Sequence, residues 1–416
     1  MRAHKPAIRF IFITLLLDVM GFGLLIPVGP KLVRELSGGN EQAGAHYFGL
    51  LAATYAAMQF IFAPTLGALS DHFGRRPVLL FSLLGSGLDY FALALSPNLA
   101  FLYVTRAING LTGGSMTVAS AYIADVTPPE KRAAGFGLVG AAFGLGFVIG
   151  PLLGGVLGRH DIRWPFYAAG ALTLANWLYG CFVVPESLPP ERRAKMTFAR
   201  SNPIGVFAGL VRYPLVAWMS AALFLLNLAQ FSLHSTWVLY TGHRYGWDAG
   251  QVGWSLFAVG IGAAVVQAGL ARRLIPALGE KTALMLGLLL GVMSYAGYGA
   301  ATQGWMIYAV IAVGSLGGIA GPAAQSLITR SVRPDEQGAV QGAITGLQSV
   351  AAILGPLIGT SIFAYAIRDP WRDQHVPGLS FYASALLAAL GWLVAGIAVT
   401  KRHEAEDPAA VQPAVK

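Results

Sequence analysis

Long apolar stretches separated by short polar ones run from one end of the chain to the other. A membrane-spanning α-helix needs about 20 mostly apolar residues, and windows of that kind recur along nearly the whole sequence. They predict twelve helices, at residues 8–30, 46–69, 77–96, 99–124, 134–157, 163–184, 213–240, 250–273, 282–301, 304–329, 338–366 and 378–399. The pattern therefore predicts an all-α membrane protein, with little chain left for a soluble domain.

Composition agrees with this prediction and argues against one class of partner. Of the 416 residues, 55% are hydrophobic and 11% are charged, whereas an average soluble domain has about 25% charged residues. The net charge of +9 could suggest nucleic-acid binding. However, with both termini in the cytoplasm, most Lys and Arg residues fall on the cytoplasmic side of the twelve helices, as the positive-inside rule requires. The basic excess therefore indicates topology, and no nucleic-acid partner is expected.

The chain contains an internal repeat. A shift of 205 positions aligns Gly113 with Gly318, and Gly150-Pro151 with Gly355-Pro356. Parallel six-helix repeats are typical of a transporter architecture in which the substrate binds between the halves, near the middle of the bilayer. The predicted organisation is an N-terminal six-helix half at 1–184, a cytoplasmic linker at 185–212, a C-terminal six-helix half at 213–400 and a cytoplasmic tail at 401–416.

A dense charged stretch, GALSDHFGRRPVLL at residues 67–80, interrupts the apolar pattern between the second and third predicted helices. Basic residues alone would be ordinary in a cytoplasmic loop, but an acid between two glycines is not. The stretch resembles the loop signature of the major facilitator superfamily, which is carried here by Gly67, Asp71, Gly74, Arg75 and Arg76.

In that superfamily the loop acts as a gate that holds the cytoplasmic ends of the two halves together. The resemblance implies that Arg75 contacts Asp125 at the end of the fourth helix, and that Asp71 meets the eleventh helix near Gly338. His72 departs from the family pattern, because arginine is usual at that position. The corresponding stretch of the second half, residues 272–281, keeps little of the pattern, which predicts a weaker latch there.

Three charged residues lie well inside predicted spans: Asp18, Asp89 and Arg106. A charge at the bilayer centre costs about 2.5–3.5 kcal/mol on insertion scales, so each needs a partner, a watery cavity or a proton. A buried ion pair could account for Arg106 and one aspartate. Two carboxylates around one arginine favour protonation of one of them, which makes the group a candidate for proton coupling. The helix around Arg106 also resembles the superfamily's arginine and glycine motif, in which the arginine modulates the proton affinity of a nearby acid.

Polar side chains within the spans are candidates for a substrate cavity. His234 is the only histidine placed well inside a predicted span, and it could serve either packing or the cavity. The candidates are Gln59, Asn109, Asn227, Gln230, His234 and Gln325.

The fifth predicted helix contains the run GLGFVIGPLLGG. Small residues four apart could simply allow a close contact between helices. The run also resembles the motif that the superfamily associates with exporters working as antiporters, carried here by Gly146, Gly150, Pro151, Gly154 and Gly155.

The runs LDVMGFGLLIPVGPKL and GEKTALMLG, with the charged loop, resemble the bacterial tetracycline/proton antiporters. The resemblance implies a proton-coupled exporter of drug-like molecules. Two departures affect the substrate, because Ala263 and Gly291 stand where the well-known tetracycline exporters carry histidine and aspartate. A transporter of an unrelated metabolite, such as a sugar or an amino acid, is the alternative.

The remaining expectations follow from this resemblance and from motifs that the sequence lacks. No nucleophile elbow, His-Glu-x-x-His motif or nucleotide-binding loop is found, so we expect no enzyme activity, no cofactor and no resident metal. The expected partners are protons, the lipid bilayer and a small-molecule substrate, free or as a metal chelate. A monomer in the bacterial inner membrane, crossing it many times and with both termini cytoplasmic, completes the prediction.

Overall fold

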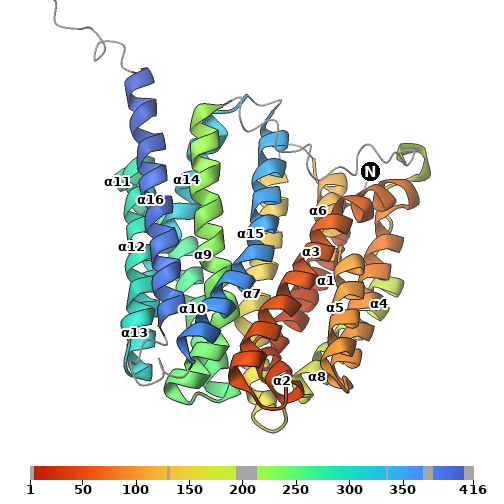
Figure 1. Ribbon diagram of the computed structural model, residues 1–416. Helices are drawn as coiled ribbons and strands as arrows, with labels where there is room; N and C mark the ends of the chain where they lie inside the picture. The colour runs from red at the N-terminus through yellow and green to blue at the C-terminus, as the bar shows by residue number, and fades with distance from the viewer. Residues whose placement is uncertain (1–3, 129–131, 194–212, 334–335, 369–377, 407–416) are drawn as a thin grey trace, which may run out of the picture. The chain divides into compact units, whose positions relative to one another are not determined.

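The computed structural model describes residues 4–128, 132–193, 213–333, 336–368 and 378–406, and the regular elements in these ranges are all helical (Figure 1). By length and composition, nine of the described helices could each cross a membrane. A tenth span would be α1 and α2 taken together, which are bent by 44° where the chain turns at Pro27. The predicted fold class, an all-α membrane protein, is confirmed.

Contacts within the chain define two compact units. Unit 1 comprises Met1–Pro203 together with Trp237–Ile261. Its helices are α1 (His4–Leu25), α2 (Gly29–Leu36), α3 (Glu41–Phe73), α4 (Arg75–Ala94), α5 (Leu99–Thr112), α6 (Ser115–Val126), α7 (Arg132–Gly158), α8 (Trp164–Val183) and η2 (Pro190–Arg192), with the end of α9 (Pro214–Tyr245) and most of α10 (Ala249–Val265). The contact boundary therefore differs from the sequence repeat, which assigns residues 237–261 to the second half. The expected linker at 185–212 lies mostly outside the described residues.

Unit 2 comprises Ile204–Thr236 and Gly262–Lys416. One apolar core joins its helices at one end, from Val216 through Ile328 to Ala398. Besides most of α9, its elements are η5 (Val266–Leu270), α11 (Ala271–Leu278), α12 (Glu280–Ala300), α13 (Gly304–Ser315), η6 (Leu316–Ile319), α14 (Ala320–Arg330), α15 (Gln337–Ala366) and α16 (Leu379–Glu406).

Four predicted spans are interrupted. The span expected at 99–124 breaks into α5 and α6 at Gly113-Gly114, and the span expected at 250–273 contains the π-helical turn η5. The span expected at 8–30 divides into α1 and α2, and the span expected at 304–329 contains the 3₁₀ turn η6. An interruption frees backbone groups that lipid cannot satisfy. At the first break, the side chain of Gln59 donates to the carbonyl of Gly113 at 2.9 Å. A side chain from α3 thus compensates for the broken helix.

The predicted antiporter motif lies in α7, where its glycines allow α1 to approach closely. A Cβ added at Gly146 would lie 2.8 Å from the Cβ of Val19, and one added at Gly150 would lie 2.8 Å from the Cα of Gly23. At Gly154, an added Cβ would collide with the carbonyl oxygen of Leu24. Helices in lipid depend on this kind of close packing, because the bilayer provides little hydrophobic drive between them.

These contacts give a stability prediction. Gly154→Ala would force α1 and α7 apart, and overpacking of this kind typically costs about 1–3 kcal/mol. We expect the thermal unfolding midpoint of the purified protein to fall. Gly144→Ala in the same helix is the matched control, because a Cβ there meets nothing within 4 Å. Equal midpoints for the two variants would contradict the packing role of Gly154.

Candidate functional site

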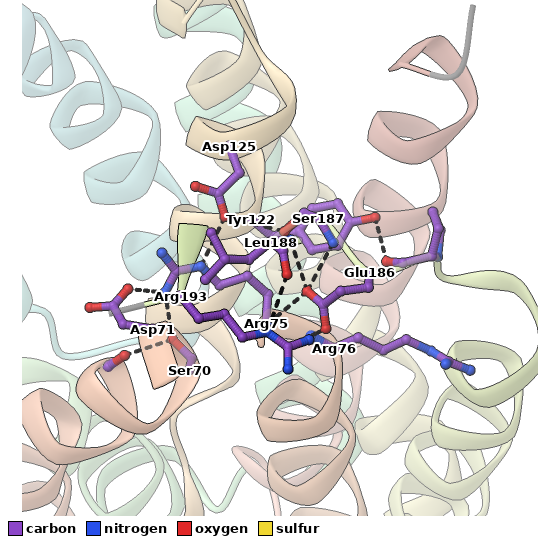
Figure 2. A network of polar contacts seen from close by, with 12 residues as sticks. Ser70, Asp71, Arg75, Arg76, Tyr122, Asp125, Glu186, Ser187, Leu188 and Arg193 are labelled. Atoms are coloured by element: carbon purple, nitrogen blue, oxygen red, sulfur yellow. Dashed lines mark hydrogen bonds and ion pairs between the residues drawn. The ribbon is translucent and has the colours of Figure 1, made fainter. Parts of the chain in front are cut away.

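The charged loop forms a compact ion-pair network at one end of unit 1 (Figure 2). Arg75 begins α4, and its Nε lies 2.9 Å from Oδ2 of Asp125 near the end of α6. Its Nη1 lies 2.6 Å from Asp71 on α3 and donates to the hydroxyl of Ser70 at 2.7 Å. The expected contact between Arg75 and Asp125 is therefore present, and one guanidinium joins three helices.

Gly74 makes the turn between α3 and α4 possible. Its φ of 107° lies in the region that favours glycine, and an added Cβ would also collide with the carboxylate of Glu186. Gly67, seven residues earlier in α3, would place a Cβ 4.0 Å from Thr117, an ordinary contact. The two glycines of the signature thus differ, since only Gly74 is required by backbone geometry.

Glu186, just beyond α8, is part of this network and was not among the sequence candidates. Its carboxylate accepts the backbone N–H groups of Arg75 at 2.9 Å and of Arg76 at 3.2 Å, the first two residues of α4 (Figure 2). These groups have no partner within the helix, and the positive end of the helix dipole favours an anion there. The sequence alone could have drawn attention to Glu186, because it is an acid that comes directly after a span, on the predicted cytoplasmic side where basic residues dominate.

The residues next to Glu186 strengthen the same connection. The hydroxyl of Ser187 donates to Asp125 at 3.2 Å, and the hydroxyl of Tyr122 donates to the carbonyl of Pro185 at 2.9 Å. Arg76 reaches the carbonyl of Cys181 at the end of α8. The segment that follows α8 is therefore bound to both the charged loop and the end of α6.

Unit 2 keeps one ion pair of the loop network with the two charges exchanged. The shift of 205 positions places Glu280 at the position of Arg75, and Arg330 at the position of Asp125. Glu280 and Arg330 lie 3.1 Å apart, and Gly279, which precedes Glu280, has a φ of 78° like its counterpart Gly74. The expected decay of the second-half loop is therefore incomplete. The loop pattern did not reveal this pair, because the two positions carry charges opposite to those of the first half.

The three intramembrane charges all lie in unit 1, and two of them form an ion pair. Arg106 on α5 contacts Asp89 on α4. The amide of Asn109, one turn along α5, donates to the same Asp89 oxygen at 2.7 Å. The rings of Tyr55 and Tyr90 lie 5.4 and 6.0 Å from the guanidinium carbon, close enough for cation–π attraction. The negative charge of Asp89 thus balances the positive charge of Arg106 where both side chains are largely buried.

Asp18 on α1 has a different partner. Its carboxylate accepts a hydrogen bond of 2.6 Å from the hydroxyl of Ser115, the first residue of α6. The ring of Tyr90, which lies beside Arg106, also reaches α1, because a Cβ added at Gly21 would lie 3.5 Å from that ring. Gln59 also donates to Tyr55 at 3.3 Å. The sequence did not single out Tyr55, Tyr90 or Ser115, because their part depends on contacts between helices.

The polar candidates of the second half separate into three groups in unit 2. Gln230 and His234, one turn apart on α9, lie 2.7 Å apart, and the hydroxyl of Tyr295 on α12 donates to Gln230 at 2.7 Å. Gln325 donates to Gln341 at 2.9 Å. Asn227 donates to the carbonyl of Leu223 in its own helix. Tyr295 and Gln341 were not among the sequence candidates, yet they hold the side chains of Gln230 and Gln325 by hydrogen bonds.

Comparisons with known proteins identify the family. The family model described as Major Facilitator Superfamily matches residues 11–356, most of the chain. This chain belongs to the Major Facilitator Superfamily. The charged loop and the intramembrane cluster are therefore features of a chain from this superfamily of transporters, and the prediction of that family is confirmed.

Two tetracycline resistance proteins and one solved transporter structure are similar to this chain. The chain is 40% identical over 376 residues to the class C tetracycline resistance protein of Escherichia coli, covering 90% of this chain and 94% of that protein. It is 37% identical over 396 residues to the class B protein of Escherichia coli, covering 94% and 96%. The crystal structure of the human organic anion transporter MFSD10 aligns with a TM-score of 0.70 and 25% identity, covering 95% of this chain and 100% of that chain.

The role of Glu186 at the start of α4 can be tested directly. Glu186→Ala removes the acceptor for two N–H groups, and the loss of such a cap typically costs about 1 kcal/mol. We expect hydrogen–deuterium exchange of the first turn of α4 to become about fivefold faster. Glu191→Ala, at an exposed acid in η2, should leave exchange in α4 unchanged. Slow exchange in both variants would show that Glu186 does not hold the helix end.

Proposed function

We propose that this protein is a proton-coupled antiporter that exports drug-like small molecules of the tetracycline type by alternating access. The observation that carries the proposal is the different pairing of the two intramembrane acids. Asp89 balances the charge of Arg106, whereas Asp18 is held by a neutral hydroxyl. A carboxyl that does not balance a cation can take up a proton without leaving that cation unpaired, whereas protonation of Asp89 would leave Arg106 without its counter-charge. Asp18 would therefore carry the exchangeable proton, with Asp89 and Arg106 beside it.

The energetics allow such an economical site. One proton moving down about one pH unit supplies roughly 1.4 kcal/mol, and about 100 mV of membrane potential adds roughly 2.3 kcal/mol when net charge moves. A tenfold uphill substrate gradient requires about 1.4 kcal/mol. One titrating carboxyl per cycle is therefore sufficient.

The charged loop would act as the cytoplasmic gate of this cycle. Arg75 would keep Asp71 and Asp125 in register, with Gly67, Gly74 and Arg76 shaping the loop, and Asp71 would meet the eleventh helix near Gly338 when the gate closes. The glycines of α7 would support the antiporter function through their packing. In this proposal both termini are cytoplasmic, and the protein works as a monomer in the bacterial inner membrane.

Substrate would contact the neutral polar groups of both halves. Gln59 and Asn109 lie beside the intramembrane cluster, and Gln230 and His234 offer a hydrogen-bonding group held by Tyr295. Gln325 and Asn227 are further candidates. The resemblance to tetracycline resistance proteins favours tetracycline, free or as a metal chelate. Because Ala263 and Gly291 replace a histidine and an aspartate of the well-known exporters, a metabolite transporter is the second candidate.

Proton flux in liposomes tests the proposal. On addition of magnesium-tetracycline, the reconstituted protein should exchange protons, and Asp18→Asn and Asp89→Asn should each abolish the flux while the protein still folds. Asp161→Asn is the control, because Asp161 lies in the short connection between α7 and α8. Full activity in both intramembrane variants would refute the coupling assignment. Proton flux with another compound, but none with tetracycline, would support the proton-coupled mechanism and show that the substrate is a different molecule.

A further inference from the structure

The segment Trp237–Ile261 follows the linker in the sequence, yet it packs within unit 1. It contains the last turns of α9 and most of α10, joined by a short connection that ends at Asp248. Asp248 and Gln251 form a reciprocal capping box, because Gln251 N–H donates to Asp248 at 2.7 Å and Asp248 N–H donates to Gln251 at 2.9 Å. The start of α10 is therefore a well-defined structure.

The same carboxylate joins this segment to α7. Nε of Arg159, which directly follows α7, lies 3.2 Å from Oδ2 of Asp248. Burial alone would raise the pKa of Asp248, but the hydrogen bond from Gln251 and the charges of Arg159 and Lys31 outweigh it and hold this pKa below its usual value. The carboxylate consequently keeps its charge at neutral pH and would lose the pair only in acid. The side chains of Arg159 and Asp248 are 45% and 50% exposed, so the pair can exchange with water.

Glycines allow α7 and α10 to approach closely beside this ion pair. A Cβ added at Gly155 would lie 2.6 Å from the carbonyl oxygen of Ala249 and 3.0 Å from the Cα of Gly253. An added Cβ at Gly253 would lie 2.7 Å from the carbonyl oxygen of Pro151. Gly154 and Gly155 therefore have different neighbours, since the first contacts α1 and the second contacts α10.

A second polar contact, between a histidine and a glutamate, crosses the linker at the same end of unit 1. Nδ1 of His243, in the last turn of α9, lies 3.1 Å from Glu41 at the start of α3. Arg34 lies 4.0 Å from the same glutamate. Both cross-linker pairs lie at the opposite end of the unit from the charged loop, because Glu41 begins α3 and Phe73, next to the loop, ends it.

We propose that the Arg159–Asp248 ion pair, together with the glycine contact between α7 and α10, is a reversible lock that holds residues 237–261 against the first half. The ion pairs of the charged loop network in unit 1 join residues that all precede the linker, whereas this pair joins residues on opposite sides of it. Alternating access requires the halves to part at each end in turn, so this contact has to open for release at the end remote from the charged loop. The inference rests on the proposed transport cycle but not on the substrate.

Alkylation of a buried cysteine measures the opening. Cys181 is the only cysteine of the chain, so Cys181→Ala provides a background for Ala249→Cys, a position that is 1% exposed in the contact. A fluorescent maleimide should label the purified protein slowly. Arg159→Gln or Asp248→Asn should each raise the labelling rate about two- to fivefold, the range expected for a half-exposed ion pair. Asparagine also caps helices well, so Asp248→Asn removes the charge and keeps the start of α10.

A double-mutant cycle separates the ion pair from other effects. The combined Arg159→Gln and Asp248→Asn variant should label no faster than either single variant, because the interaction is already lost. Arg159→Asp should label fastest, and adding Asp248→Asn should reverse part of that increase. The matched control is Glu35→Gln with Arg163→Gln, a pair at the same end whose partners, 3.3 Å apart, both precede the linker. Neutralising the control pair should leave labelling unchanged.

The glycine contact is tested in the same assay. Gly155→Ala should accelerate labelling and Gly144→Ala should not, because only the former would meet backbone atoms of α10. Parental labelling rates in Arg159→Gln and Asp248→Asn would overturn the proposal, and so would equal acceleration in the control pair. Since the assay needs no substrate, a protein that does not transport tetracycline can still confirm the lock.

Discussion

The close approach of α1 and α7 is the constraint on which the rest of unit 1 depends. Without side chains at Gly146, Gly150 and Gly154, the two backbones come close enough for dispersion forces to hold them together in lipid. This places Asp18 on α1 within reach of Ser115, and so next to the ion pair of Asp89 and Arg106. The glycine contact with α7 therefore fixes the position of α1, and with it the position of Asp18 in the polar cluster.

The sequence predicted those features that depend on residue type and spacing. The contact of Arg75 with Asp125 was implied by the resemblance of the charged loop to the superfamily's signature, and the pairing of Arg106 with an aspartate followed from the cost of a buried charge. Tyr295 and Ser115 could not be paired in advance, because their partners come from distant helices and hydroxyls are common. Glu186 could be noticed as an acid after a span, but its backbone partners on α4 could not be predicted. The break at Gly113-Gly114 was not predicted either, because hydropathy does not indicate which backbone hydrogen bonds are made.

The two units reuse one local solution at the turn between consecutive helices. In each, a glycine with positive φ ends one helix and starts the next, and the following residue pairs with a charge near the end of a third helix. The turn geometry and the ion pair are kept although the signs of the charges are exchanged. The constraint common to both units is therefore that opposite charges meet there, and not which helix carries which sign.

This exchange of signs bears on how the two repeats could have diverged. Any route between the two arrangements that changes one residue at a time passes through an intermediate with two like charges, or with one neutral partner, at this position. Such an intermediate is tolerable where water screens the charges, as around Arg330, whose side chain is 67% exposed. Around Arg75, which is 10% exposed and also holds Asp71, the same intermediate would be costly. An exchange of signs is therefore less costly in the second repeat than in the first.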